Sequence, residues 1–88
     1  MEHDEFIRML AKEGFTEVVT VTRAADGFLE SHSHSFEAKA FILQGEIHLY
    51  IGETTLICQP GNVFHLLANE LHSERYGRDG VTYLVGRK

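Results

Sequence analysis

The stretch "GFLESHSHSFEAKAFILQG", residues Gly27–Gly45, is the most informative part of this 88-residue chain. Two histidines, His32 and His34, stand two positions apart, and an apolar run follows them and stops at Gly45. Successive side chains of an extended strand point to opposite faces, so residues two apart share a face. The spacing therefore predicts two imidazoles on one face of a β-structure, where they can share a cation or serve as polar surface.

Segments with the two-residue period of β-strands continue on both sides of this stretch. About eight short strands are predicted, each bounded by turn signals: residues 16–23, 28–34, 39–44, 46–51, 55–59, 63–68, 72–76 and 81–86. Gly45 is expected to form a tight turn or bend between two of them. Strands spaced by about 8–12 residues are typical of β-sandwiches and barrels. The sequence thus predicts an all-β fold.

The N-terminal segment, residues 1–14, has a helical period instead. Its apolar residues lie near one stripe of a helix: Phe6, Ile7, Met9 and Leu10. Gly14 is a stop signal. We expect a short N-terminal helix within residues 1–14, a β-barrel over residues 16–86 and a single domain over residues 1–88. The helix is expected to pack across the sheet or against a second subunit.

The composition excludes several classes of protein. The net charge is −5, and the basic residues are scattered apart from the final Arg87 and Lys88, so no nucleic-acid partner is expected. No apolar run approaches the roughly 20 residues that span a bilayer, so no membrane partner is expected. The single cysteine, Cys58, cannot form an internal disulfide, is expected to be buried, and fits a cytoplasmic location.

Three of the six histidines form a candidate metal site. A divalent transition metal needs three or four nitrogen, sulfur or oxygen donors that converge on one point. His32 and His34 supply two donors, and His72, at the start of a later strand, is the best candidate for the third. Water or a small-molecule ligand would fill the open positions. Iron, zinc, manganese and nickel all remain candidates for this divalent transition-metal cofactor.

The stretch from Gly27 to Tyr76 resembles the cupin superfamily, whose fold is the double-stranded β-helix, a jelly-roll-like barrel. The first cupin motif places a Gly before HxH, a Glu three or four residues after it and a Gly further on. The residues that match are Gly27, His32, His34 and Gly45. The second motif aligns its His with His72, whereas its Pro, Gly and Asn are replaced by Leu67, Asn69 and Tyr76. "PGNVFHL", residues 60–66, also resembles a turn and strand common in the family.

The carboxylate of the first motif is missing from its usual place. It would fall on Ala38 or Lys39, and Glu37 stands one position early. On a regular strand Glu37 faces away from His32 and His34, whereas a bulge would bring it back. Some cupins, including thiol dioxygenases, bind metal through three histidines alone. The resemblance therefore implies a three-histidine site.

Other residues are candidates for contacts around the metal or its ligand: Glu37, Phe41, His48, Tyr50 and His65. His48 alternates with apolar neighbours and lies on the opposite face, which is either the outer surface or the barrel lumen. His65 either supports a ligand or is a core imidazole bonded to a carbonyl. An apolar lumen suited to a small organic molecule is expected, lined by Phe36, Phe41, Phe64 and Leu66.

Three functions remain open. The first is a small metal-binding cupin that binds or transforms a small organic ligand, such as a carbonyl, hydroxy-acid or thiol compound; whether it is an enzyme is undecided, and its catalytic residues are unknown. The second, implied by resemblance to the ligand-sensing halves of arabinose-type regulators, is a metal-independent small-molecule-binding or sensor module. The third is a structural dimer. A homodimer is expected because small cores and open strand edges favour pairing.

Overall fold

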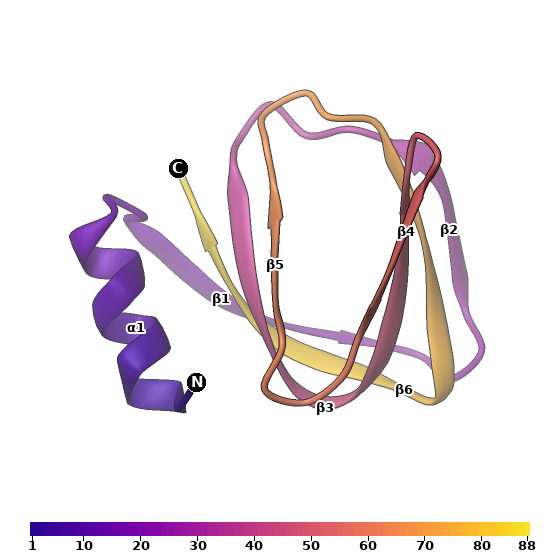
Figure 1. The fold of residues 1–88 in the computed structure, drawn as a ribbon, viewed down its shortest axis with the longest axis horizontal. Helices are drawn as coiled ribbons and strands as arrows, with labels where there is room; N and C mark the ends of the chain where they lie inside the picture. The colour runs from indigo at the N-terminus through magenta and orange to yellow at the C-terminus, as the bar shows by residue number, and fades with distance from the viewer.

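The computed structural model describes all 88 residues and contains one short helix and six antiparallel strands. Helix α1 spans His3–Lys12. The strands are β1 (Glu17–Arg23), β2 (Phe28–His32), β3 (Ala38–Ile51), β4 (Thr54–Cys58), β5 (Val63–Leu66) and β6 (His72–Arg87). The predicted all-β fold with a short N-terminal helix is confirmed (Figure 1). No helix has the length and apolar character needed to cross a membrane.

Two long strands, β3 and β6, form the frame of the barrel. They pair along most of their lengths, from Ala38 opposite Arg87 to Tyr50 opposite Ser73. On its other edge, β3 pairs first with β5 and then with β4. In the same way, β6 pairs first with β2 and then with β1. The two halves, β2–β6–β3–β4 and β1–β6–β3–β5, curve around one interior (Figure 1).

The chain bends at Gly45, one of the two alternatives predicted there, but it does not leave the strand, so the predicted division into two strands is wrong. Gly45 lies within β3, and the register with β6 shifts on both sides of it. Its φ is +77°, and that of Gly80 in β6 is +73°. Glycine adopts such values at little cost, and the bulges increase the local bend. The predicted break at residues 77–80 likewise lies inside β6. Six strands therefore replace the eight that were predicted.

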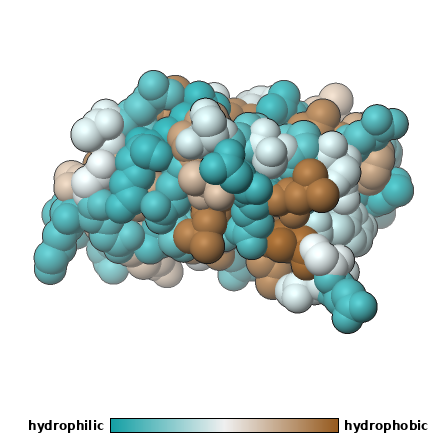
Figure 2. All heavy atoms as spheres, turned by 90° about the horizontal axis from the view of Figure 1, so that it is seen from above, coloured by the Kyte–Doolittle hydropathy of each residue, from teal (hydrophilic) through white to brown (hydrophobic).

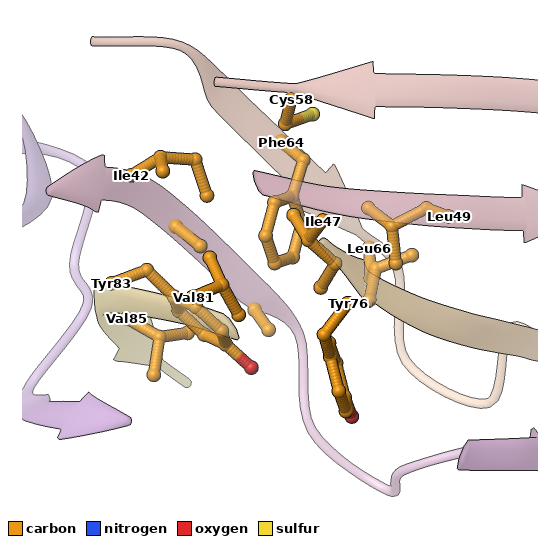
Figure 3. Close-up of a cluster of buried hydrophobic side chains, with 12 residues drawn as sticks. Ile42, Ile47, Leu49, Cys58, Phe64, Leu66, Tyr76, Val81, Tyr83 and Val85 are labelled. Atoms are coloured by element: carbon orange, nitrogen blue, oxygen red, sulfur yellow. The ribbon is translucent and has the colours of Figure 1, made fainter. Parts of the chain in front are cut away.

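The barrel interior is filled by a packed cluster of 12 buried residues (Figure 3). Ile42, Ile47 and Leu49 are completely buried. Phe64 and Tyr83 meet edge to face, with ring centroids 5.5 Å apart. Phe64 and Leu66, which were expected to line a ligand cavity, belong to this cluster. Cys58 is buried there as predicted.

Helix α1 covers the outer face of the sheet, so the prediction that it packs across the sheet is confirmed (Figure 1). Phe6 and Leu10 are completely buried, and Phe6 stacks on Phe41 with centroids 5.2 Å apart. The prediction that Phe41 lines the lumen is wrong. Its neighbours Ala40 and Ile42 point into the barrel, so Phe41 points out toward the helix.

Some large apolar side chains remain exposed: Met1, Val18, Phe28, Leu29, Leu56, Ile57, Leu67 and Leu71. They come from several strands, from the chain start and from the loop between β5 and β6. Figure 2 shows one face of the molecule, on which hydrophobic residues form small groups between hydrophilic ones. Scattered apolar residues of this kind are normal on a protein surface.

Candidate metal centre

Three histidines from two separate parts of the chain meet at one place. His32 ends β2, His34 lies two residues later in the connection to β3, and His72 begins β6. Strands β2 and β6 are hydrogen-bonded neighbours, and His32 stands directly opposite His72 in their register. The pairing of these two strands therefore brings together the three imidazoles that the sequence singled out.

The three rings are close enough to share one cation. Their centroids are 4.2 Å apart for His32 and His72, 5.0 Å for His32 and His34, and 5.4 Å for His34 and His72. One nitrogen atom of each ring lies within 4.8 Å of the other two. Metal-bound imidazole nitrogens lie about 2.0–2.1 Å from zinc, so a modest inward movement brings all three into one coordination shell.

Hydrogen bonds fix the tautomers of two of these rings. The Nδ1 atom of His32 donates a hydrogen bond to the backbone carbonyl oxygen of Glu30 at 2.7 Å. The Nδ1 atom of His72 donates a hydrogen bond to the backbone carbonyl oxygen of Glu70 at 3.0 Å. A carbonyl can only accept, so in each neutral ring the proton is on Nδ1 and the lone pair is on Nε2. Both Nε2 atoms are buried and have no hydrogen-bond partner. Such orphaned atoms are uncommon, and this tautomer is the one that metal-binding histidines adopt.

The third ring, His34, is half-buried and lies against an aromatic side chain. It stacks on Phe36 with centroids 4.8 Å apart and an interplanar angle of 18°. Burial lowers the pKa of His34, and the neighbouring rings of His32 and His72 lower it further. These effects favour the neutral imidazole, which is the form that binds metals.

A buried carboxylate, Glu74, lies beside two of the histidines and was missed by the sequence analysis. Its Oε2 atom is 3.3 Å from Nε2 of His72 and 3.5 Å from Nε2 of His32. Because side chains alternate along β6, His72, Glu74 and Tyr76 share one face. The spacing of "HSERY" is the same two-residue signal that drew attention to "SHSH", and it would have found Glu74.

Two tyrosines flank Glu74 on the core side. The hydroxyl of Tyr76 donates to Oε1 of Glu74 at 2.9 Å. Burial, and then the charge of Glu74, raise the pKa of Tyr76 well above its ordinary value and that of Tyr83 to about 12. In Figure 3 both hydroxyls lie on the side of the core cluster away from Cys58. Both phenols therefore keep their protons at neutral pH, and Tyr76 remains a donor to Glu74.

Glu37 and His65 form a pair on the outer surface. Nε2 of His65 donates to Oε2 of Glu37 at 2.5 Å, and the His65 side chain is 42% exposed. Phe64 and Leu66 point into the core, so the residue between them points outward. The alternative of a core imidazole is therefore wrong. Glu37 faces away from the three histidines, as expected for a regular strand, and the alternative of a bulge that turns it back is not observed.

His48 and Tyr50 also lie outside the histidine cluster. Ile47 and Leu49 point into the core, so His48 and Tyr50 face outward from β3. Nε2 of His48 donates to Oε2 of Glu46 at 2.7 Å. The open choice for His48 between lumen and outer surface is thus decided in favour of the outer surface.

A shallow surface hollow lies next to His34. Its volume is about 250 Å³, and its lining residues are Thr16, Glu17, Phe36, Arg87 and Lys88. Phe36 therefore contacts His34 and also lines this hollow. The guanidinium carbon of Arg87 lies 4.9 Å from the centre of the Phe36 ring. The barrel interior is packed, and the link between this hollow and the three histidines is Phe36, which stacks on His34.

No protein-family model and no curated protein matches the sequence. Solved structures do match the fold. The cupin domain of Schizosaccharomyces pombe Cnp3 has a TM-score of 0.71 and 19% identity, over 80% of this chain and 50% of that one. KdgF from Halomonas sp. matches with a TM-score of 0.67 and 15% sequence identity, and the match covers 80% of this chain and 67% of KdgF. The DMSP lyase DddQ from Ruegeria pomeroyi DSS-3 matches with a TM-score of 0.74 and 24% sequence identity, and the match covers 81% of this chain and 36% of the lyase.

These comparisons establish the fold of the chain. At such low identities, similarity of structure shows architecture and leaves activity open. The chain has the cupin fold, as its resemblance to that superfamily implied. It spans between about a third and two thirds of the length of the three proteins named above.

Proposed function

We propose that this cupin-fold chain binds one divalent transition metal through His32, His34 and His72 and uses it to bind or transform a small organic ligand. One observation carries the proposal: the buried Nε2 atoms of His32 and His72 have no partner, while each Nδ1 is held by a carbonyl. Two lone pairs are thereby presented beside a third imidazole. This donor set suits iron, zinc and nickel, and accommodates manganese.

The protein's own residues prepare the site before any metal arrives. The carbonyls of Glu30 and Glu70 hold two rings in one tautomer and orientation. Phe36 limits the orientation of the His34 ring by stacking on it. A metal bound there supplies Lewis acidity that polarises an oxygen or sulfur atom of the ligand.

A small organic acid is the ligand class that the surroundings favour. The hollow has an aromatic wall, Phe36, and two cationic residues, Arg87 and Lys88. It also contains Glu17, whose carboxylate accepts a hydrogen bond from Nη1 of Arg87 at 3.1 Å. Nε of Arg87 is buried and lacks a hydrogen-bond partner. Guanidinium groups bind carboxylates through paired N–H donors. A ligand carboxylate that displaces Glu17 from Arg87 would lie beside Phe36, whose ring stacks on His34.

The metal content of the purified protein tests the proposal. Elemental analysis of the wild type is expected to find close to one transition-metal ion per chain, and to identify it. The variant His34→Ala is expected to lose the metal, whereas His48→Ala, which removes an outward-facing imidazole, is expected to retain it. A wild-type chain that carries no metal and takes none up from a solution of Zn²⁺, Fe²⁺, Mn²⁺ or Ni²⁺ would refute the proposal.

Metal-independent binding is the second candidate function, and the composition of the hollow favours it. None of the residues that line the hollow is one of the three histidines. A sensor or binding module of this kind is expected to show a higher melting temperature with small organic acids in the presence of a chelator. If the rise in melting temperature with small organic acids is lost when the chelator removes the metal, the metal-dependent function is supported instead.

A homodimer and a cytoplasmic location stay predictions. Strands β1 and β4 stand at the two ends of the sheet order, and the backbone donors and acceptors of such edges favour pairing with a second copy. Light scattering after size-exclusion chromatography tests the dimer, and a monomer at micromolar concentration would contradict it. The single buried thiol of Cys58 is compatible with a reducing compartment.

A further inference from the structure

We infer that Glu74 is the fourth protein ligand of this metal centre, and that it replaces the carboxylate missing at Ala38 and Lys39. The inference rests on the proposed metal binding and extends it. With Glu74, the metal would have one anionic ligand in addition to the three neutral imidazoles. The replacement comes from β6, next to His72, instead of from the segment that follows the HxH pair.

The distances around Glu74 suit a shared cation better than a hydrogen bond. Its Oε2 atom lies 3.3 Å and 3.5 Å from the two Nε2 atoms of His72 and His32. Hydrogen bonds between nitrogen and oxygen are typically about 2.7–3.2 Å long. Neighbouring ligand atoms of a tetrahedral zinc ion, with bonds of about 2.0–2.2 Å, lie about 3.3–3.5 Å apart. The two separations measured from Oε2 of Glu74 match the second situation.

The protonation pattern points the same way. In the neutral form that binds metals, the rings of His32 and His72 carry the proton on Nδ1, which donates to a carbonyl, so each presents the lone pair of Nε2 toward Oε2 of Glu74. A carboxylate oxygen is itself an acceptor. Three lone pairs with no proton between them repel one another, and a metal cation in their midst reverses that repulsion.

The burial of Glu74 also favours a bound cation. Its side chain is 7% exposed, and its ion pairs involve the two histidines and no lysine or arginine. A buried carboxylate without a compensating cation is expensive. The Tyr76 hydroxyl occupies Oε1 and leaves Oε2 free to face the histidines. A metal ion supplies the missing positive charge.

Glu37 provides a matched control within the same chain. It lies nearest in sequence to the expected position of the cupin carboxylate, yet its carboxylate pairs with His65 on the outer surface. Its backbone N–H and carbonyl are both bonded to Lys88, which holds it there. Removing the charge of Glu37 therefore changes the chain's net charge as removal of Glu74 does, but leaves the metal centre untouched.

Titration of the metal-free full chain with Co²⁺ and Zn²⁺ tests the inference, with Co²⁺ absorption as the spectroscopic signature. The variant Glu74→Gln keeps the shape of the side chain and an acceptor for Tyr76. It is expected to lower metal affinity by more than about 100-fold, because groups that only orient a ligand account for about 10- to 100-fold. The Co²⁺ visible bands are expected to shift. Glu37→Gln is expected to match the wild type in both measurements.

The outcomes separate this inference from the function on which it rests. If the wild type binds no metal, the proposed function fails and the inference fails with it. If His34→Ala loses the metal but Glu74→Gln keeps wild-type affinity and spectrum, the three-histidine site stands and Glu74 is no ligand. A loss below 100-fold with unchanged Co²⁺ bands also overturns the inference, because Glu74 is then a positioning residue. Should Glu74→Gln fail to fold, Glu74→Asp, which keeps the charge on a shorter side chain, is expected to show the same loss.

Discussion

Gly45 in β3 and Gly80 in β6 touch where the two long strands bend, and a Cβ atom on Gly45 would lie 2.0 Å from the carbonyl oxygen of Gly80. No ordinary contact is that short, so the backbone of one strand would have to move. The close approach of these strands allows the sheet to curve into a barrel. In that barrel β2 pairs with β6, and the pairing brings His32 beside His72.

Replacing Gly45 by alanine is therefore expected to destabilise the protein strongly. A steric conflict with backbone, added to a φ of +77°, is expected to cost about 3 kcal/mol or more. Gly52 is the control, because it has a φ of +58° but no atom within 4 Å of an added Cβ. Gly52→Ala is expected to cost about 1 kcal/mol. Urea unfolding measures both, and equal costs would contradict the packing argument.

Truncation of Phe6 tests how firmly α1 is held on the sheet. This side chain is completely buried and stacks on Phe41. Phe6→Ala is expected to reduce the free energy of unfolding by about 3–5 kcal/mol, through lost burial and a cavity. Arg8→Ala, on the exposed side of the same helix, is expected to have an effect within about 0.5 kcal/mol. A small effect of Phe6→Ala in urea unfolding would show that the helix is dispensable to the barrel.

The pair of Glu46 and His48 is expected to contribute to stability above acidic pH only. Hydrogen bonds from Gln59, and next from His48, lower the pKa of Glu46. A lowered carboxyl pKa stabilises the folded chain above the unfolded value of about 4.5, and this contribution is lost as the pH falls through the folded value. Glu46→Gln is expected to lose less stability than the wild type between pH 6 and pH 3.5, measured by urea unfolding.

The exposed residue Glu53 provides the matching control for this pH dependence. Glu53→Gln is expected to follow the wild-type curve over the same pH range. Parallel curves for Glu46→Gln and the wild type would mean that the bonds from Gln59 and His48 do not persist in solution.

Cys58 is expected to be unreactive while the chain is folded. Its side chain is buried in the core, and burial raises the pKa of the thiol. The thiolate, which is the reactive form, is therefore scarce and inaccessible at pH 8. Absorbance of the released product of Ellman's reagent is expected to rise slowly for the native chain and at once in denaturant. Complete labelling of the native chain within seconds would contradict the buried position.

The metal-free form of Glu74→Gln is expected to be more stable than the metal-free wild type at pH 8. The substitution removes a buried charge, and the new amide can donate to an Nε2 atom that otherwise lacks a partner. We expect a gain of about 1–2 kcal/mol by urea unfolding in the presence of a chelator. Added Zn²⁺ is expected to reverse the order, because it stabilises the wild type more. A less stable metal-free variant would show that Glu74 is already well compensated without metal.

The local pattern of residues determined much of this protein. A two-residue apolar period gave the strands because alternation of faces is a property of the extended backbone itself, and the "SHSH" spacing placed two imidazoles together for the same reason. His72 was identified as their partner, although its position beside them depends on the pairing of β2 with β6. The helix was also predicted correctly from its apolar stripe.

Other features depend on which strands lie next to one another, and the sequence pattern does not contain that information. Gly45 is typical of a turn, but its contact with Gly80 makes it a bend inside β3. Phe41 and Phe64 are equally apolar, but they lie on opposite faces of the sheet. Phe41 packs against α1 on the outer face, and Phe64 packs inside the barrel. Glu74 differs from Glu37 in the same way. Both are acidic residues near a histidine in the sequence. The two-residue spacing puts Glu74 on the face of His72, and the register between β2 and β6 adds the imidazole of His32 beside it.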